Sequence, residues 1–131
     1  MVIVNTAIRP LVMVVDDEEE LVELYSRFIE LSGLDCKYFT DPKEALDNFS
    51  LNYHRYSLVI TDLRMPSLGG IDFAKRIRKY NKSVKILLIT NFLIESNLDY
   101  DEVKQAGIDM VLEKPFHFKD LRPIIKEILG A

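Results

Sequence analysis

The chain has 131 residues and a formal net charge of −4, and its 48% hydrophobic and 29% charged residues are ordinary for one globular domain. The acidic balance argues against direct nucleic-acid binding, which requires a basic face. The single cysteine, Cys36, excludes an intramolecular disulfide and a cysteine-based zinc site. No apolar run reaches the roughly 20 residues of a membrane span and no signal peptide is visible, so we expect a cytoplasmic protein without membrane association.

Five short apolar runs have the length of β-strands: LVMVV (11–15), LDCKYF (34–39), SLVIT (57–61), VKILLIT (84–90) and DMVLE (109–113). The first, third and fourth are apolar at successive positions, which is typical of parallel strands covered on both faces. The second and fifth are weaker, so we expect them at or near the edges of the sheet. Residues 1–10 are expected to form a tail or short extension before a domain that spans 11–129.

Helical patterns alternate with these runs. The acidic residues 18–20 would begin the first helix, which stops at Gly33. Its apolar residues at three- and four-residue spacing are Leu21, Leu24, Tyr25, Phe28 and Leu31. A second helix would be capped by Thr40 or Asp41, with Pro42 in its first turn, and apolar spacing from Ile71 to Tyr80 indicates a third. A fourth, less regular helix is expected around 96–106 and ends at Gly107. The last helix would run from about 117 to 129, with Pro123 near its first turn. Five alternations of strand and helix predict an α/β fold with a parallel sheet and helices on both faces.

In an open parallel sheet, ligands bind beyond the carboxyl ends of the strands. The predicted strands end in polar residues that would meet at this edge: Asp16 and Asp17, Asp62, Thr90, and Lys114. Any one of these residues alone would more often be a helix cap, a turn residue or a surface lysine. Their joint occurrence on four strand ends favours a functional site.

The chemistry of these side chains indicates phosphoryl transfer. Three carboxylates at one edge repel one another unless a cation neutralises them, and a hard divalent ion such as Mg²⁺ suits oxygen ligands. Asp62 stands alone at the end of a central strand and is the best candidate for a nucleophile toward phosphorus. Lys114 would place a positive charge near the phosphoryl oxygens, and Thr90 would donate a hydrogen bond.

The segments VVDDEEE, VITDLRMP with the following GG, LLIT and EKPF, in this order, resemble the receiver domain of two-component response regulators. The resemblance covers about residues 10 to 130. It implies a flavodoxin-like (CheY-like) fold with strand order 2-1-3-4-5. It also implies that Asp62 accepts a phosphoryl group from a histidine of a sensor histidine kinase or histidine phosphotransfer protein.

The resemblance further implies how the site is used. Asp17, Asp62 and the backbone carbonyl of Arg64 would hold Mg²⁺ directly, with Asp16 acting partly through water. Thr90 would swing toward the phosphoryl group and Lys114 would form a salt bridge with it, and the Lys114–Pro115 bond is often cis in this family.

Two positions depart from the family pattern. The family usually carries an aromatic ring three residues before the lysine as a rotamer switch, and here that residue is Val111, whose χ1 is stiff. Phe92 or Met110 would have to replace the ring. Asn91 follows Thr90 where a small residue is common, and the stretch between Thr90 and Lys114 is about two residues longer than usual.

Two other functions stay open at this point. The first is a pseudo-receiver, which would keep the fold as a phosphorylation-independent interaction or dimerisation module. The second is a Mg²⁺-dependent phosphatase with an aspartyl-phosphate intermediate, although that class places its nucleophile in a DxD motif after the first strand. A receiver would act as a phosphoryl acceptor with slow self-dephosphorylation rather than as a turnover enzyme. Its output would be a downstream protein target that the sequence does not name, and it could form a homodimer. It would work either as a stand-alone regulator or as part of a longer one.

Overall fold

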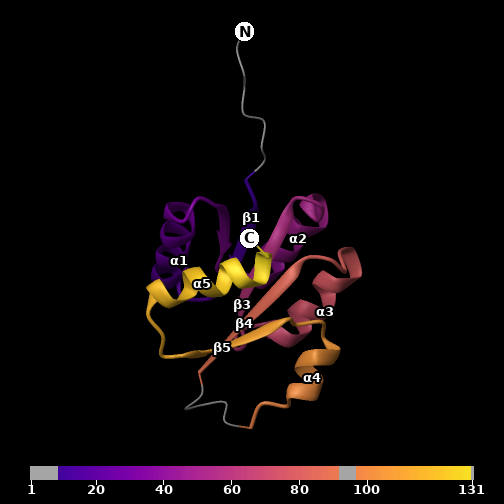
Figure 1. The fold of residues 1–131 in the computed structure, drawn as a ribbon. Helices are drawn as coiled ribbons and strands as arrows, with labels where there is room; N and C mark the ends of the chain where they lie inside the picture. Colours follow the sequence, from indigo (N-terminus) through magenta and orange to yellow (C-terminus); the bar gives the residue numbers. More distant parts are fainter. Residues whose placement is uncertain (1–8, 92–96, 131) are drawn as a thin grey trace.

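The computed structural model describes residues 9–91 and 97–130, in which five strands alternate with five helices (Figure 1). The strands are β1 Leu11–Val15, β2 Asp35–Phe39, β3 Tyr56–Asp62, β4 Lys85–Asn91 and β5 Met110–Lys114. The helices are α1 Glu19–Leu31, α2 Pro42–Asn52, α3 Gly70–Tyr80, α4 Tyr100–Gln105 and α5 Phe118–Leu129. Within the described ranges, no helix is long and apolar enough to cross a membrane.

The strands form one parallel sheet in the order β2-β1-β3-β4-β5. This order confirms the predicted topology and places the two weakly apolar strands, β2 and β5, at the edges. The central strands are buried along nearly their whole length, because helices cover both faces of the sheet.

Alternate residues of each strand point to opposite faces. On β1, Met13 and Val15 pack with α2, α3 and α4, whereas Val12 and Val14 pack with α1 and α5. The molecule therefore has two apolar layers, and the strand ends are left as the edges at which polar groups gather.

Local signals explain where several helices begin and end. The Asp41 carboxylate accepts the backbone N–H of Lys43 at 2.9 Å, so this residue, rather than Thr40, caps α2. Gly33 and Gly107 adopt positive φ angles of 92° and 81° just beyond α1 and α4, which is the backbone conformation that stops a helix.

The apolar spacing predicted the buried face of α1 only in part. Leu24 and Leu31 are 51% and 86% exposed, whereas Val22 and Ile29 are fully buried. The helix carries more apolar residues than one face can bury, so spacing alone does not fix which of them face the sheet. In α5, Pro123 lies inside the helix beyond its first turn.

Helix α4 is shorter than the range predicted from the sequence. Asn97 and Leu98 are not helical, and residues 92–96 lie outside the described residues. The Asp99 carboxylate accepts the N–H groups of Asp101 and Glu102 at 3.0 and 3.3 Å, which caps the helix and fixes its start at Tyr100.

Gly70 lies where α3 meets the end of β3. A Cβ atom at this position would overlap the carbonyl oxygen of Asp62 and come within 2.9 Å of Leu88 Cδ1. The missing side chain therefore lets α3 approach the backbone of the residue that ends β3. The neighbouring Gly69 has room for a Cβ atom, since its nearest contact would be the carbonyl oxygen of Leu63 at 3.5 Å.

We expect Gly70→Ala to lower the free energy of unfolding by about 1–3 kcal/mol, because the added methyl group forces α3 away from β3. Urea unfolding followed by circular dichroism measures this change. Gly69→Ala is the matched control and should change stability by less than about 1 kcal/mol. Equal effects of the two substitutions would contradict the close approach at Gly70.

Candidate functional site

Three carboxylates converge at the carboxyl-terminal edge of the sheet. Asp16 and Asp17 follow β1, and Asp62 is the last residue of β3. Pairing of β1 with β3 places Val15 opposite Thr61, so the next residues on each strand are neighbours. The three side chains offer oxygen atoms that all lie within 4.8 Å of one another.

Asp16 is the buried member of the cluster and is only 3% exposed. Its Oδ1 accepts the backbone N–H of Glu18 at 3.0 Å, the residue that precedes α1. Burial raises the pKa of Asp16 from 3.8 to about 6, and the nearby Asp62 adds to this shift. The Glu18 N–H and the ammonium of Lys114 oppose the shift without cancelling it.

Asp62 is half-buried and turned toward the same space. Its Oδ1 accepts the backbone N–H of Leu63 at 2.9 Å. Burial is the largest cause of its raised pKa, while Lys114 and the Leu63 N–H lower it. The second carboxylate oxygen, Oδ2, lies 4.0 Å from Lys114 Nζ.

Lys114 brings the positive charge of the site from the far edge of the sheet. It ends β5, and its Nζ lies 4.0 Å from Oδ2 of Asp16 as well as of Asp62. The Lys114–Pro115 peptide bond is cis, as the resemblance implied. In the part of the chain that the structure describes, this one ammonium lies among three carboxylates, which leaves the cluster net negative.

Thr90 lies in β4, next to the residue that pairs with Asp62, since Asp62 is opposite Ile89. It is 2% exposed, and among the described residues its Oγ1 is a buried side-chain oxygen with no hydrogen-bond partner. Buried hydroxyl groups are normally hydrogen-bonded, so a hydroxyl without a partner at a strand end points to a missing ligand group.

The other positions singled out in the sequence lie around this edge. Arg64 is exposed in the loop after β3, and the role of its carbonyl as a metal ligand stays a prediction. Asn91 pairs with Lys114 across β4 and β5. Val111 is half-buried against the α2, α3 and α4 layer, Met110 packs on the opposite layer, and Phe92 lies outside the described residues.

The donor set fits a hard divalent cation. Carboxylate oxygens are the ligands that Mg²⁺ prefers, and Asp16, Asp17 and Asp62 offer three of them in one group, with Asp17 exposed to solvent. An ion of charge +2 would also offset the effects that raise the pKa of Asp16 and Asp62, which are first burial and then repulsion between carboxylates.

Sequence reasoning missed three groups that shape the site. The backbone N–H groups of Glu18 and Leu63 orient the carboxylates of Asp16 and Asp62. An Asp followed two residues later by a helix start is the signal that could have indicated the first contact. Tyr25 is buried close to the cluster, and its pKa is raised, first by burial and then by the charges of Asp16 and Asp62.

The family model described as the response regulator receiver domain matches residues 12–126. The chain belongs to this family. Receiver domains of response regulators act in two-component systems, where they interact with histidine kinases or phosphotransfer proteins, and they typically use Mg²⁺ at an acidic pocket.

Curated relatives include a "Transcriptional regulatory protein CpxR homolog" of Haemophilus influenzae, 37% identical over 119 residues, which are 89% of this chain and 49% of that protein. A second is the "Response regulator receiver protein CpdR" of Brucella abortus, 30% identical over 92% of this chain and 97% of that protein. The receiver chain thus spans about half the length of the first relative and nearly all of the second.

Solved structures share the receiver fold. A response regulator receiver domain protein from Clostridium thermocellum superposes with a TM-score of 0.80 and 26% identity, covering 92% of this chain and 94% of that one. The Vibrio cholerae chemotaxis protein CheY4 superposes with a TM-score of 0.80 and 25% identity, over 92% and 99% of the two chains.

The raised pKa of Asp16 predicts how the stability of the metal-free receiver depends on pH. Between the unfolded value of 3.8 and the folded value of about 6, the folded chain holds more protons than the unfolded chain, so stability falls as pH rises. We expect Asp16→Asn to raise the free energy of unfolding by about 1–3 kcal/mol at pH 7.5 in EDTA, and to have little of this effect at pH 4.

Urea unfolding of both proteins at the two pH values measures this difference. Asp47→Asn, which changes an exposed acid of α2, is the control and should behave as the wild type at both pH values. A stabilisation by Asp16→Asn that is the same at pH 4 and pH 7.5 would disprove the electrostatic cause.

Thr90→Val replaces the buried hydroxyl with a methyl group of similar shape. Because Oγ1 has no hydrogen-bond partner, we expect the substitution to stabilise the metal-free receiver by about 1 kcal/mol. Thermal unfolding measures it. Thr61→Val is a comparison within the same sheet, since Thr61 Oγ1 is also buried but donates to the carbonyl oxygen of Asp62, and this variant should not be stabilised.

Proposed function

We propose that this receiver accepts a phosphoryl group on Asp62 from a phosphohistidine of a sensor histidine kinase or histidine phosphotransfer protein. A carboxylate oxygen of Asp62 would attack phosphorus, forming a P–O bond while the P–N bond to the donor imidazole breaks and the imidazole takes up a proton. One observation carries the proposal. Asp62 at the end of β3 and Lys114 at the end of β5 lie close together on either side of β4, whose Thr90 hydroxyl lacks a hydrogen-bond partner.

Each neighbouring group would have a defined part in this transfer. The ammonium of Lys114, now 4.0 Å from the carboxylates of Asp16 and Asp62, would move to pair with the phosphoryl oxygens. The Thr90 hydroxyl would gain the acceptor that it lacks in the unmodified protein. Bound Mg²⁺, held by Asp16, Asp17, Asp62 and the Arg64 carbonyl, would supply positive charge that offsets the carboxylates and the incoming phosphoryl oxygens.

The raised pKa of Asp62 affects how well its carboxylate can attack phosphorus. A protonated carboxyl is a poor nucleophile, and burial favours that form. A cation at the cluster would restore the charged form of the carboxylate, so we expect phosphoryl transfer to require a divalent ion.

The phosphorylated state would act on a protein partner through a shift in population between two conformations. The output would be a downstream protein target or a second copy of the chain, in the cytoplasm, with self-dephosphorylation as the slow reverse step. Such a protein is a signalling switch rather than a turnover enzyme.

Incubation with acetyl phosphate and Mg²⁺, followed by mass spectrometry of the intact protein, tests the proposal. We expect the wild type to gain one phosphoryl group, Asp62→Asn to gain none, and Asp47→Asn to match the wild type. EDTA should abolish the addition.

Two results would contradict this function. A wild type that gains no phosphoryl group in Mg²⁺ would favour the pseudo-receiver, and equal addition to Asp62→Asn would move the acceptor elsewhere. Steady release of phosphate from a phosphate monoester would instead favour the phosphatase hypothesis.

A further inference from the structure

A cavity of about 580 Å³ lies at the opposite end of the sheet from the carboxylates. Tyr56 and Lys85, the first residues of β3 and β4, are part of its lining, as is Pro10 just before β1. Helix α5 closes one side with residues of its last two turns. Its volume falls within the range of about 300–1,000 Å³ that is typical of small-molecule sites.

The wall of this amino-end cavity is mainly apolar. The apolar side chains come from the residue before β2, the residue before β4 and helix α5: Leu34, Val84, Ile125, Ile128 and Leu129. Apolar walls of this kind bind the hydrocarbon or aromatic part of a ligand by excluding water.

The charge of the cavity is opposite to that of the chain as a whole. Lys85, Arg122 and Lys126 line it, together with the imidazole of His54, and no Asp or Glu is among the described residues of the lining. All four side chains are exposed, so their polar ends reach water at the rim. In a chain of net charge −4, three cations without a carboxylate make a local site that favours anions.

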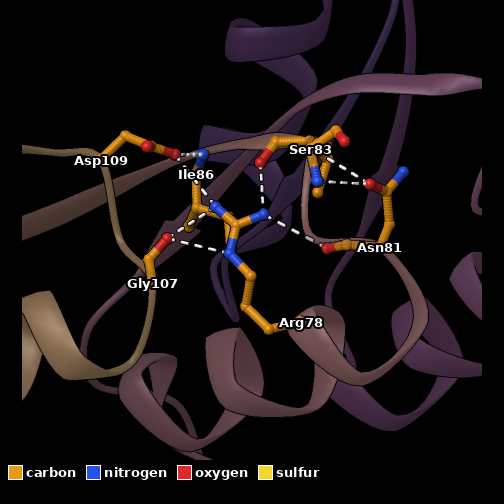
Figure 2. A network of polar contacts seen from close by, with 7 residues as sticks. Arg78, Asn81, Ser83, Ile86, Gly107 and Asp109 are labelled. Carbon is orange, nitrogen blue, oxygen red and sulfur yellow. Dashed lines mark hydrogen bonds and ion pairs between the residues drawn. The ribbon is translucent and has the colours of Figure 1, made fainter.

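The wall between α3 and β4 is held in place by Arg78, as Figure 2 shows. The guanidinium donates to the carbonyl oxygens of Asn81 at 3.2 Å, Val84 at 2.5 Å and Gly107 at 2.6 Å, and pairs with the Asp109 carboxylate at 3.0 Å. Three loop carbonyls and one carboxylate are therefore tied to a single side chain that is itself largely buried.

The side chain of Asn81 completes this support. Its Oδ1 accepts the backbone N–H groups of Ser83 and Val84 at 2.7 and 3.0 Å, and its Nδ2 donates to the carbonyl oxygen of Tyr53 at 2.7 Å. Asn81, Ser83 and Val84 all line the cavity. A wall fixed before binding lowers the entropy cost of binding, so the cavity is a preformed site rather than a gap between loops.

We propose that the amino-end cavity binds a small organic anion with an apolar body, such as a medium-chain carboxylate. The body lies against the apolar wall and the anionic head faces Lys85, Arg122 and Lys126. This site is separate from Asp62 and does not depend on the phosphoryl-acceptor function, because all its lining residues belong to the other end of the sheet.

Fluorescence titration of the full chain with 8-anilinonaphthalene-1-sulfonate, an aromatic anion, tests the proposal, with decanoate and 1-decanol as competitors. We expect saturable binding of one probe molecule that decanoate displaces at lower concentration than decanol. The double variant Arg122→Gln with Lys126→Gln should weaken probe binding about 3- to 10-fold, the effect of losing two partly exposed charge pairs. Lys119→Gln, which removes a cation of α5 that does not line the cavity, should leave binding unchanged.

Two-dimensional amide NMR of the full chain with decanoate locates the site. We expect the largest shifts at Ser57, Ser83 and Ile128, and a raised melting temperature because the ligand binds the folded state. Absence of saturable binding, equal weakening by Lys119→Gln and the double variant, or shifts centred on residues around Asp62 would each overturn the proposal.

Discussion

The structure depends on a balance of charge at the carboxyl-terminal edge of the sheet. Three carboxylates share a space less than 5 Å across, and a single ammonium, Lys114, lies 4.0 Å from two of them. Burial makes the negative charge of Asp16 and Asp62 costly and raises the pKa of both carboxyl groups, so a cation bound near them would lower those pKa values. The unpartnered hydroxyl of Thr90 adds a second unsatisfied group. The site thus combines carboxylates that a cation would stabilise with a hydroxyl that lacks an acceptor, and the proposed phosphoryl transfer rests on these two features.

Much of this arrangement was predictable from the sequence because parallel strands share one carboxyl end. If the apolar runs are strands of one parallel sheet, Asp16, Asp62 and Lys114 meet at one edge, and the structure has them there. The inner face of α1 was harder to predict, since Leu24 and Leu31 are as apolar as the residues that are buried. The start of α4 is set by a local contact of the Asp99 carboxylate, which the less regular pattern of residues 96–106 did not reveal. The hydrogen bonds from Glu18 and Leu63 are backbone contacts, and side-chain identity carries little information about them.

The two ends of the sheet differ in how far their polar groups are hydrogen-bonded. At the carboxyl end the polar groups are side chains with too few partners, whereas at the amino end Arg78 and Asn81 satisfy a series of loop carbonyls and N–H groups (Figure 2). Sequence reasoning did not find the amino-end cavity, because its lining comes from five separate segments whose closeness depends on how α5 packs. The rigid loops at that end give β3 and β4 fixed starting points. Those strands carry Asp62 and Thr90 at their other ends.

Helix α4 is attached to the rest of the fold by few buried side chains. It has six residues, of which Val103 alone is buried, and isolated helices of this length are unstable in water. Its amide protons should consequently exchange with solvent by local opening that leaves the sheet intact, at a free-energy cost well below that of global unfolding. A segment so weakly attached can be reshaped by a partner or by a change at the neighbouring strand end without disturbing the hydrophobic layers beneath it.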